Sequence, residues 1–386
     1  DIMLINREIT DAIKNLARKY PILAVTGPRQ SGKTTLLKSI FQDYQYVSLE
    51  NPDNRSFAET DTNGFLQKYD KYVIIDEAQR VPVLFSYLQT LTDESGLMGQ
   101  FILSGSQNFH LMKNITQSLA GRVAIFKLFP FDFREMTSAN LLHENYLENI
   151  IKGFYPAIYN RDIPSEIFYA NYVQTYLQRD VSELIAIKDI RLFQNFLALC
   201  ATRAGQLLNL NALANACGIS QPTAKAWMSA LENSYVVFLL YPYHENFSKR
   251  IVKTPKLYFY DTGLLCYLLK INDADQIHTH PLKGSLFENM MIAEYVKRMY
   301  HRNMMRDIWF WRDAEGHEVD LIIQESSELN AIEFKATQTV LLDLFKGLSY
   351  FGNLTKREIS KTLVYGGTDN HERNQVKVVS WKDAVN

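Results

Sequence analysis

The sequence has few cysteines, and they are widely separated. Its 386 residues contain three, Cys200, Cys217 and Cys266. An odd number at this spacing gives neither a disulfide framework nor the paired cysteines of a zinc site, and this is typical of a reducing compartment. We therefore expect a protein without structural disulfides or cysteine-bound zinc.

Long apolar runs and excess charge of one sign are also missing. No stretch approaches the roughly 20 apolar residues of a membrane helix, and charged residues such as Asp11 and Lys14 interrupt the start of the chain, unlike a signal peptide. The formal net charge of -1 excludes a uniformly basic nucleic-acid-binding protein, although a local basic face can hide in a neutral total. We expect a cytoplasmic protein without a membrane partner.

The pattern of apolar segments changes twice along the chain. Over residues 1–135 short apolar strands alternate with helices, which predicts an α/β domain with a parallel sheet. Residues 136–270 are mainly helical and end in two strand-like segments. In residues 271–386 a helix precedes a series of strands. Without a repeat or a low-complexity linker, we expect these three parts to pack together.

The segment Gly27 to Thr34 reads GPRQSGKT and fits the phosphate-loop pattern G-x-x-x-x-G-K-[ST]. It lies between a predicted strand, PILAVTG, and a predicted helix, KTTLLKSIFQ, which is the context that this motif requires. Backbone N–H groups and the positive end of the helix would hold the phosphates of ATP, with Lys33 reaching the β and γ phosphates. The expected nucleotide contacts are Gly27, Pro28, Arg29, Gln30, Ser31, Gly32, Lys33, Thr34 and Thr35.

A second apolar strand, YVIIDEAQ, ends in the acidic pair Asp76 and Glu77. This is the pattern of a Walker B site, in which Asp76 and Thr34 would hold Mg²⁺ and Glu77 would polarise the attacking water. A surface acidic pair is the alternative, but the phosphate loop upstream disfavours it. The sequence therefore predicts ATP binding with Mg²⁺ and ATP hydrolysis.

Polar residues follow the next strand, FILSGSQ. Ser104, Ser106 and Gln107 would either sense the γ-phosphate or merely form a turn. Further on, SLAGRV contains Arg122, which would either contact the nucleotide of a neighbouring subunit or form a structural salt bridge. The first role of Arg122 requires a homo-oligomer, which we therefore predict.

The middle part contains a helix-turn-helix pattern followed by two strands, as in a winged helix. Gln221, Thr223, Lys225 and Trp227 would lie near the front of the second helix, which enters the major groove in DNA-binding proteins. Basic residues of the wing would contact phosphates. The alternative is a protein-packing module with Trp227 in the core. The basic residues of the predicted wing are Lys249, Arg250, Lys253 and Lys256.

Two neighbouring strands in the last part carry a constellation of charged residues. EVDLIIQ contains Asp320, and NAIEFKA contains Glu333 and Lys335, whose alternation sends both side chains to one face. Asp320 and Glu333 would share a divalent metal, and Lys335 would position a water or steady a phosphate. Glu288 on the preceding helix would complete the site, with Glu294 as the alternative. This pattern is typical of metal-dependent phosphodiester cleavage, although exposed E-x-K segments on strands are common.

Segments along nearly the whole chain, among them GPRQSGKTTLL, IDEAQRVP, LFPFDFRE, KTPKLYFYDTGL and FWRDAEGHEVDLII, resemble the prokaryotic AAA-type ATPases with a C-terminal domain of unknown function. The resemblance implies an AAA domain, a winged helix and a domain similar to PD-(D/E)XK nucleases, as in archaeal Holliday-junction resolvases. In that family pattern GSLFE supplies Glu288, EVD supplies Asp320, and EFK supplies Glu333 and Lys335. Val319 replaces the proline before the aspartate.

The sequence thus predicts an ATPase whose nucleotide cycle controls a DNA-interacting C-terminal half with a candidate Mg²⁺ nuclease site. A nucleotide-switched interaction protein, with an inactive nuclease-like domain, is the alternative that the neutral charge favours. A transcription regulator that binds DNA through the winged helix is a third option, which depends on exposure of Gln221 to Trp227.

Overall fold

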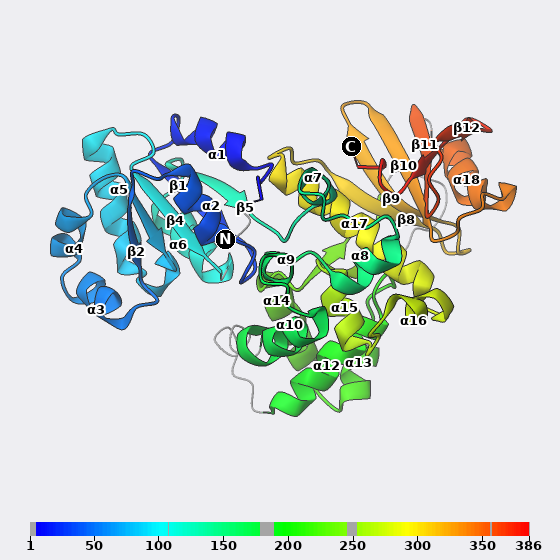
Figure 1. The fold of residues 1–386 in the computed structure, drawn as a ribbon, viewed down its shortest axis with the longest axis horizontal. Helices are drawn as coiled ribbons and strands as arrows, with labels where there is room; N and C mark the ends of the chain where they lie inside the picture. The colour runs from blue at the N-terminus through cyan, green and yellow to red at the C-terminus, as the bar shows by residue number, and fades with distance from the viewer. Residues whose placement is uncertain (1–4, 107, 178–188, 245–252, 356, 386) are drawn as a thin grey trace.

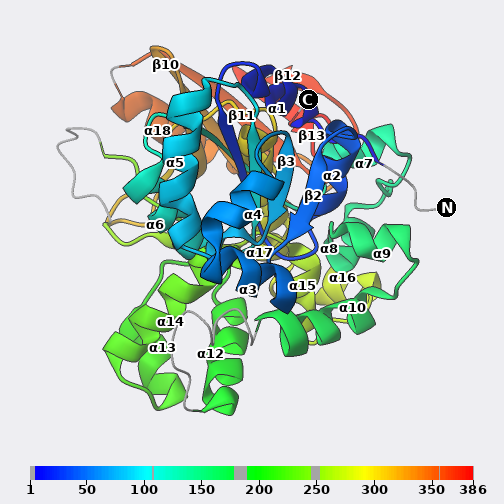
Figure 2. The ribbon, with the colours of Figure 1, turned by 90° about the vertical axis from the view of Figure 1, so that its left-hand side faces the viewer.

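The computed structural model describes the chain except residues 1–4, 107, 178–188, 245–252, 356 and 386. Figure 1 shows two sheet-containing parts, one formed by the start and one by the end of the chain, with the helices of the middle part below and between them. The view in Figure 2 looks onto the N-terminal part and places α9 and α10 beside it.

The N-terminal sheet is entirely parallel, with the strand order β2-β3-β4-β1-β5. Its three central strands, β3, β4 and β1, are buried on both faces, as is typical of parallel sheets. Helices α1 and α2 cover one face, and α3 to α6 cover the other. The predicted α/β domain is confirmed. The strands are β1 (Ile22–Thr26), β2 (Gln45–Ser48), β3 (Val73–Asp76), β4 (Phe101–Gly105) and β5 (Val123–Lys127). The helices are α1 (Thr10–Ala17), α2 (Lys33–Ile40), α3 (Pro52–Thr60), α4 (Thr62–Lys68), η1 (Ala78–Arg80), α5 (Val83–Ser95) and α6 (Asn108–Ser118).

The middle part contains helices and one antiparallel strand pair, β6 with β7. The turn between α13 and α14 has Gly218 in a left-handed conformation (φ 67°), and Ser220 caps α14 by accepting from the backbone N–H of Thr223. The predicted order of two helices and a strand pair is observed, and the winged-helix assignment stays a prediction. The elements are α7 (Phe133–Ser138), α8 (Tyr146–Lys152), α9 (Pro156–Asn160), α10 (Ser165–Asn171), η2 (Tyr172–Leu177), α12 (Ile190–Thr202), α13 (Leu210–Cys217), α14 (Gln221–Asn233), β6 (Val237–Leu240) and β7 (Lys256–Phe259).

The C-terminal sheet is mixed, with the order β12-β13-β11-β10-β9-β8. Helix α17 packs on β10 from one face, and α18 covers β9, β10 and β11 from the other. The nuclease-like assignment of this part stays a prediction. The elements are α15 (Thr262–Leu268), α16 (Ala274–Thr279), α17 (Lys283–His301), β8 (Ile308–Arg312), β9 (Glu318–Glu325), β10 (Glu328–Lys335), η3 (Leu342–Phe345), α18 (Lys346–Leu354), β11 (Ile359–Tyr365), β12 (His371–Arg373) and β13 (Val376–Ser380).

One hydrophobic core extends from Phe131 to Val385 and joins the middle helices to the α17 face of the C-terminal sheet. Helix α17 lies at the centre of this arrangement, since it also contacts β5, β7, α8 and α15. The predicted boundary at residue 270 therefore runs through continuous packing, and the three-domain division stays a prediction. None of the described helices is long and apolar enough to cross a membrane.

Candidate functional site

The phosphate loop connects β1 to α2 in a conformation that its glycines permit. Gly27 has φ 150°, and a Cβ atom there would lie 2.1 Å from the backbone oxygen of Leu128. Gly32 is left-handed (φ 94°) directly before α2. The Nζ of Lys33 donates to the backbone oxygens of Gly27 at 2.9 Å and Pro28 at 2.8 Å. The loop is thus curved around the Lys33 ammonium group, as a phosphate cradle requires.

Asp76 lies at the end of β3 beside the start of α2. Its Oδ2 accepts from the Thr34 hydroxyl at 2.9 Å and from the Tyr46 hydroxyl at 2.9 Å. Its Oδ1 accepts from Ser104 at 2.5 Å, so Ser104 orients Asp76 and does not face the nucleotide site. Burial and the Asp76 carboxylate raise the pKa of Tyr46 above its ordinary value. The paired Thr34 and Asp76 oxygens fit the Mg²⁺ ligands that the sequence predicts.

Glu77 follows Asp76 with a left-handed backbone (φ 54°). Its Oε2 accepts from the Gln79 amide at 2.5 Å and from the Ser106 hydroxyl at 3.3 Å. These two donors fix the Glu77 carboxylate at the edge of the nucleotide site, where it can orient a water. Gln107, the other residue predicted at this strand tip, lies outside the described residues.

A cavity of about 430 Å³ opens between the phosphate loop and the middle part of the chain. The predicted residues that line it are Arg29, Gln30, Gly32, Lys33, Thr34, Thr35, Asp76, Glu77 and Ser106. The opposite wall was not predicted: it consists of Pro156, Ala157 and Asn160 of α9, followed by Arg161. Ser31 is fully buried behind the loop, so its side chain does not line this cavity.

Arg122 does not reach this cavity within the chain. It precedes β5, and its backbone oxygen accepts from the first residue of β1, Ile22, at 3.2 Å. Arg122 therefore lies at the amino ends of the strands, opposite the phosphate loop at their carboxyl ends. Its guanidinium forms a two-point ion pair with Asp93, at 2.6 and 2.8 Å. The structural salt bridge is observed, and contact of Arg122 with the nucleotide of a neighbouring subunit stays a prediction.

The structure brings the three predicted residues of the C-terminal sheet together. Lys335 Nζ lies 2.7 Å from Glu333 Oε2 and 3.6 Å from Asp320 Oδ2. Asp320 Oδ2 also accepts from the backbone N–H of Phe334 at 2.9 Å. Both carboxyl groups are buried, with 4% of Asp320 and 5% of Glu333 exposed. The predicted alternation of Glu333 and Lys335 toward one face is confirmed.

A third acid, Glu288, joins them from α17, together with Glu318 and Lys256, which sequence reasoning missed in this role. Carboxylate oxygens of Glu288, Glu318 and Asp320 lie within 4.8 Å of one another. The ammonium group of Lys256 contacts Glu288 at 3.1 Å and also contacts Glu318. Tyr258 donates its hydroxyl to Glu288 at 2.6 Å. We call Glu288, Glu318, Asp320, Glu333, Lys335 and Lys256 the C-terminal cluster.

Two of the earlier expectations are corrected here. Lys256, predicted on the wing for phosphate contact, is 2% exposed and paired inside the cluster. Glu294, the alternative to Glu288, is buried elsewhere: it pairs with Lys297 at 3.0 Å and accepts from the backbone N–H of Phe133 at 2.6 Å. The cluster therefore uses Glu288.

Burial and mutual repulsion set the protonation of the cluster. Burial, together with the charges of Asp320 and Glu318, raises the pKa of Glu288 to about 7 against the opposing effect of Lys256. Burial and Asp320 raise the pKa of Glu333 well above its usual range. Burial acts in the same direction on Asp320, but Lys335 and Lys256 keep its pKa below the ordinary value. A divalent metal would therefore have to displace protons before all the acids could bind it.

The recognition helix predicted for DNA is only partly available. Trp227 is 6% exposed and packs edge-on against Phe193 and Phe196 at 5.5 Å, so its predicted role in DNA contact is wrong. Gln221 and Lys225 are exposed. Thr223 is partly exposed, and Lys253 lies exposed before β7. Lys249 and Arg250 lie outside the described residues.

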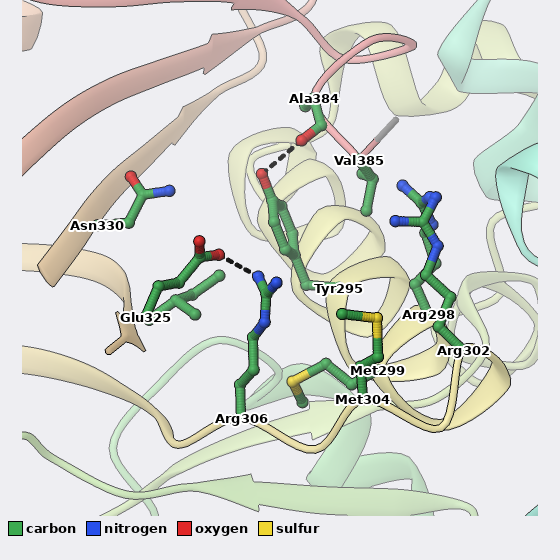
Figure 3. Close-up of a pocket in the computed structure, with 11 residues that line it drawn as sticks. Tyr295, Arg298, Met299, Arg302, Met304, Arg306, Glu325, Asn330, Ala384 and Val385 are labelled. Atoms are coloured by element: carbon green, nitrogen blue, oxygen red, sulfur yellow. Dashed lines mark hydrogen bonds and ion pairs between the residues drawn. The ribbon is translucent and has the colours of Figure 1, made fainter. Parts of the chain in front are cut away.

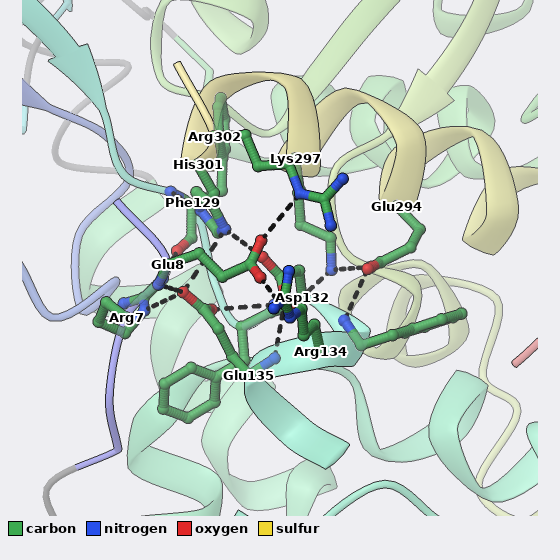
Figure 4. A network of polar contacts seen from close by, with 12 residues as sticks. Arg7, Glu8, Phe129, Asp132, Arg134, Glu135, Glu294, Lys297, His301 and Arg302 are labelled. Atoms are coloured by element: carbon green, nitrogen blue, oxygen red, sulfur yellow. Dashed lines mark hydrogen bonds and ion pairs between the residues drawn. The ribbon is translucent and has the colours of Figure 1, made fainter. Parts of the chain in front are cut away.

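A buried polar network joins the phosphate loop to α17 (Figure 4). Arg7 donates to the backbone oxygen of Ser31 at 2.9 Å and to Glu135 at 2.9 Å. Next to it, His301 at the end of α17 lies 2.7 Å from Asp132 through Nδ1 and accepts from a backbone N–H through Nε2. Because both ring nitrogens are engaged, the group of Asp132, Glu135 and His301 serves as a joint between elements and not as a metal site.

Comparisons with known proteins match most of the chain. Family models match an AAA domain over residues 19–137, a domain of unknown function (DUF8612) over 143–275 and another (DUF4143) over 283–384. Uncharacterized proteins of Mycobacterium tuberculosis and Mycobacterium bovis are each 30% identical over 342 residues, which cover 87% of this chain and 75% of theirs. The Walker-type ATPase PABY2304 of Pyrococcus abyssi is 14% identical, with a TM-score of 0.46, over 69% of this chain and 96% of that chain. The chain belongs to the family of AAA-domain P-loop ATPases that carry this C-terminal domain of unknown function.

Proposed function

We propose that the protein hydrolyses Mg-ATP in the cavity between the phosphate loop and α9, and that the nucleotide controls the position of the middle and C-terminal parts. One observation carries this proposal. The cavity has the phosphate-loop residues on one wall and Pro156, Ala157, Asn160 and Arg161 on the other. A ligand that contacts both walls favours the arrangement in which they are close.

Four residues of the cavity, Lys33, Thr34, Asp76 and Glu77, carry the proposed reaction. Lys33 and the loop N–H groups bind the β and γ phosphates, and Thr34 and Asp76 provide the oxygens that hold Mg²⁺. Bound Mg²⁺ supplies electrostatic stabilisation of the phosphate oxygens. Glu77, fixed by Gln79 and Ser106, orients the water for in-line attack on the γ-phosphate.

The experiment is a comparison of ATP hydrolysis and conformational response in wild type and Lys33→Ala. Wild type should release phosphate from ATP only with Mg²⁺, and small-angle scattering should differ between the nucleotide-free and ATP-bound states. Lys33→Ala should lose both responses. If the protein hydrolyses ATP but its scattering is identical in all states, the proposed ATPase activity stands. The proposal that the nucleotide controls the position of the C-terminal part is then refuted.

Metal-dependent DNA cleavage by the C-terminal cluster is a second candidate function. It is favoured by the convergence of Glu288, Asp320 and Glu333 with Lys335, the residues that the family resemblance implies for a nuclease. The opposing observation is Lys256, whose buried ammonium group already neutralises Glu288 and Glu318. The same pairing supports the alternative of an inactive nuclease-like domain that serves protein interaction.

Asp320→Asn separates these two candidates because it preserves the shape of the site and removes a ligand charge. Linear, branched and single-stranded DNA would be incubated with wild type, Asp320→Asn and Lys33→Ala, with Mg²⁺ or Mn²⁺. Cleavage that Asp320→Asn abolishes while ATP hydrolysis persists would identify an ATP-regulated nuclease. Calorimetric Mn²⁺ binding at the cluster, absent in Asp320→Asn, gives a readout that does not depend on cleavage. Hydrolysis of ATP without either result would establish the interaction protein.

The proposed homo-oligomer depends on Arg122 acting across a subunit boundary. Light scattering with ATP and Glu77→Gln protein, which we expect to hold ATP, should give a mass above that of one chain. Arg122→Ala should then lower ATP hydrolysis in the oligomer and leave the mass unchanged. A strict monomer under these conditions leaves Arg122 only its salt bridge with Asp93.

A further inference from the structure

A cavity of about 200 Å³ lies where the last turns of α17 meet the β9–β10 hairpin. It is at the far end of the hairpin from the C-terminal cluster, because Glu325 and Asn330 line it while Asp320 and Glu333 lie toward the other ends of their strands. Figure 3 shows Arg298 and Arg302 on one side of the cavity and Arg306 with Glu325 on the other. None of these residues has a role in the functions proposed above.

Arg298 is the unusual member of this wall. Only 4% of the residue is exposed, and among the described residues its Nε and Nη2 atoms have no hydrogen-bond partner. An arginine side chain stays charged at any physiological pH, so it cannot avoid the cost of burial by losing a proton. Two buried guanidinium nitrogens without a partner are strongly unfavourable, and they indicate a binding partner that the described residues do not supply.

The surrounding residues make the cavity positive. Arg302 contacts Glu8 at 3.4 Å, and Arg306 pairs with Glu325. The lining contains three arginines and one glutamate, and when Glu8 is counted with its partner Arg302 an excess of one positive charge remains, that of Arg298. Asn330 uses its Oδ1 to accept from Ser360 at 3.0 Å, and Figure 3 shows its amide nitrogen on the cavity side. Arg298 and the Asn330 amide thus offer N–H donors to the cavity, and Arg302 and Arg306 add positive charge to its walls.

We propose that this cavity binds a phosphate group, as inorganic phosphate or as the phosphate of a phosphomonoester. The planar guanidinium fork matches tetrahedral oxyanions with two parallel hydrogen bonds. The cavity is smaller than the roughly 300 to 1,000 Å³ of pockets for drug-sized ligands, which suits a small anion. The carbonyl end of α17 is nearby and disfavours an anion, but this effect is weaker than that of an unpaired buried guanidinium.

The test uses full-length protein in a Lys33→Ala background, which removes the phosphate loop as a competing site. Inorganic phosphate and AMP would be titrated separately by calorimetry, with chloride keeping the ionic strength constant. Lys33→Ala should bind one phosphate group per chain. Adding Arg298→Met, which keeps the side-chain volume and removes the charge, should weaken binding about 10- to 100-fold. Arg191→Met, at an exposed arginine of α12, is the matched control and should bind like the parent.

The melting temperature gives a second result that a purely structural arginine would not produce. Without phosphate, Arg298→Met should melt higher than its parent because it lacks an unpaired buried charge. With phosphate, the parent should gain stability and Arg298→Met should not.

Tighter binding of AMP than of phosphate would identify a phosphomonoester as the ligand, and the reverse order would identify the free ion. Phosphate binding that survives Arg298→Met, or is absent from the parent, overturns the proposal. If Arg298→Met does not fold, Arg298→Lys removes the fork with the charge retained, and the same comparison applies.

Discussion

Glu77 is the cavity residue whose substitution should separate ATP binding from hydrolysis. Its carboxylate accepts hydrogen bonds from Gln79 and Ser106 and makes none to the phosphate loop, so Glu77→Gln leaves the phosphate contacts in place. We expect kcat to fall by about 10² to 10⁴, while the Kd for ATP stays near that of wild type. Phosphate release and equilibrium ATP binding measure the two quantities. Lys33→Ala is the contrasting variant and should lose binding; a similar loss in Glu77→Gln would show that Glu77 holds the nucleotide.

Glu294 should make stability depend on pH. Burial, with Asp132 acting in the same direction and Lys297 opposing, raises the pKa of Glu294 from 4.5 to about 7. Between these values the folded protein keeps a proton that the unfolded chain releases. The free energy of unfolding should therefore decrease as pH rises through this range, by up to about 3 kcal/mol.

Glu294→Gln cannot ionise and should lack this decrease. Urea unfolding of both proteins at several pH values from 4.5 to 8 would measure it. Glu148→Gln, at an exposed position of α8, is the control and should follow the wild-type slope. Equal slopes in wild type and Glu294→Gln would mean that Glu294 is already ionised at acidic pH.

At the scale of elements, Arg7 joins the segment before α1 to the phosphate loop and to the segment after β5. Its guanidinium contacts Glu135 and the backbone oxygens of Ser31 and Phe129, with 5% of the side chain exposed. Arg7→Met leaves Glu135 without this partner and should lower the free energy of unfolding by about 3 to 5 kcal/mol. Arg134→Met removes an ion pair with Glu8 from a side chain that is 58% exposed, and should cost less than about 1 kcal/mol. The urea midpoints of the two variants measure these losses of stability. Similar losses would show that the buried contacts of Arg7 stabilise the protein no more than an exposed ion pair does.

The elements that the sequence predicts best are those with a local signal. The phosphate loop and the strand before Asp76 combine an apolar run with characteristic polar residues, and both are confirmed. Glu318 could have been found from the same kind of signal, because Glu318 and Asp320 are two apart on a strand and share a face. Lys256 was predicted on the wrong surface, because the sequence shows its charge but not the direction of its side chain. Lys256 and Tyr258 are two residues apart on β7, so their side chains lie on the same face, and both contact Glu288.

At the scale of the whole molecule, the decisive contacts are between residues far apart in the sequence. Arg7 and Glu135 are 128 residues apart, and neither belongs to a motif that would indicate the other. The wall of the nucleotide cavity that α9 forms also depends on contacts between distant parts of the sequence. The sequence of a helix this short does not indicate which part of the chain the helix packs against. Sequence motifs therefore predict the chemistry of the phosphate loop, and tertiary packing alone determines what the loop can influence.

Arg161 offers a way to measure how the bound nucleotide acts on α9. It lines the nucleotide cavity from beyond the residues that the AAA family model matches. A charge-assisted contact from Arg161 to a phosphate oxygen would contribute about 1.5 to 3 kcal/mol, so Arg161→Met should weaken ATP binding about 10- to 100-fold.

In wild type, ATP should also slow amide hydrogen exchange across residues 156–161, because the ligand holds α9 against the phosphate loop. Arg161→Met at saturating ATP should bind nucleotide without this protection, whereas Arg191→Met, at an exposed arginine of α12 outside the cavity lining, should keep it. Full protection in Arg161→Met would mean that the nucleotide contacts α9 through the apolar and amide side chains of the helix. Pro156 and Asn160, and not Arg161, would then couple the nucleotide to the middle part of the chain.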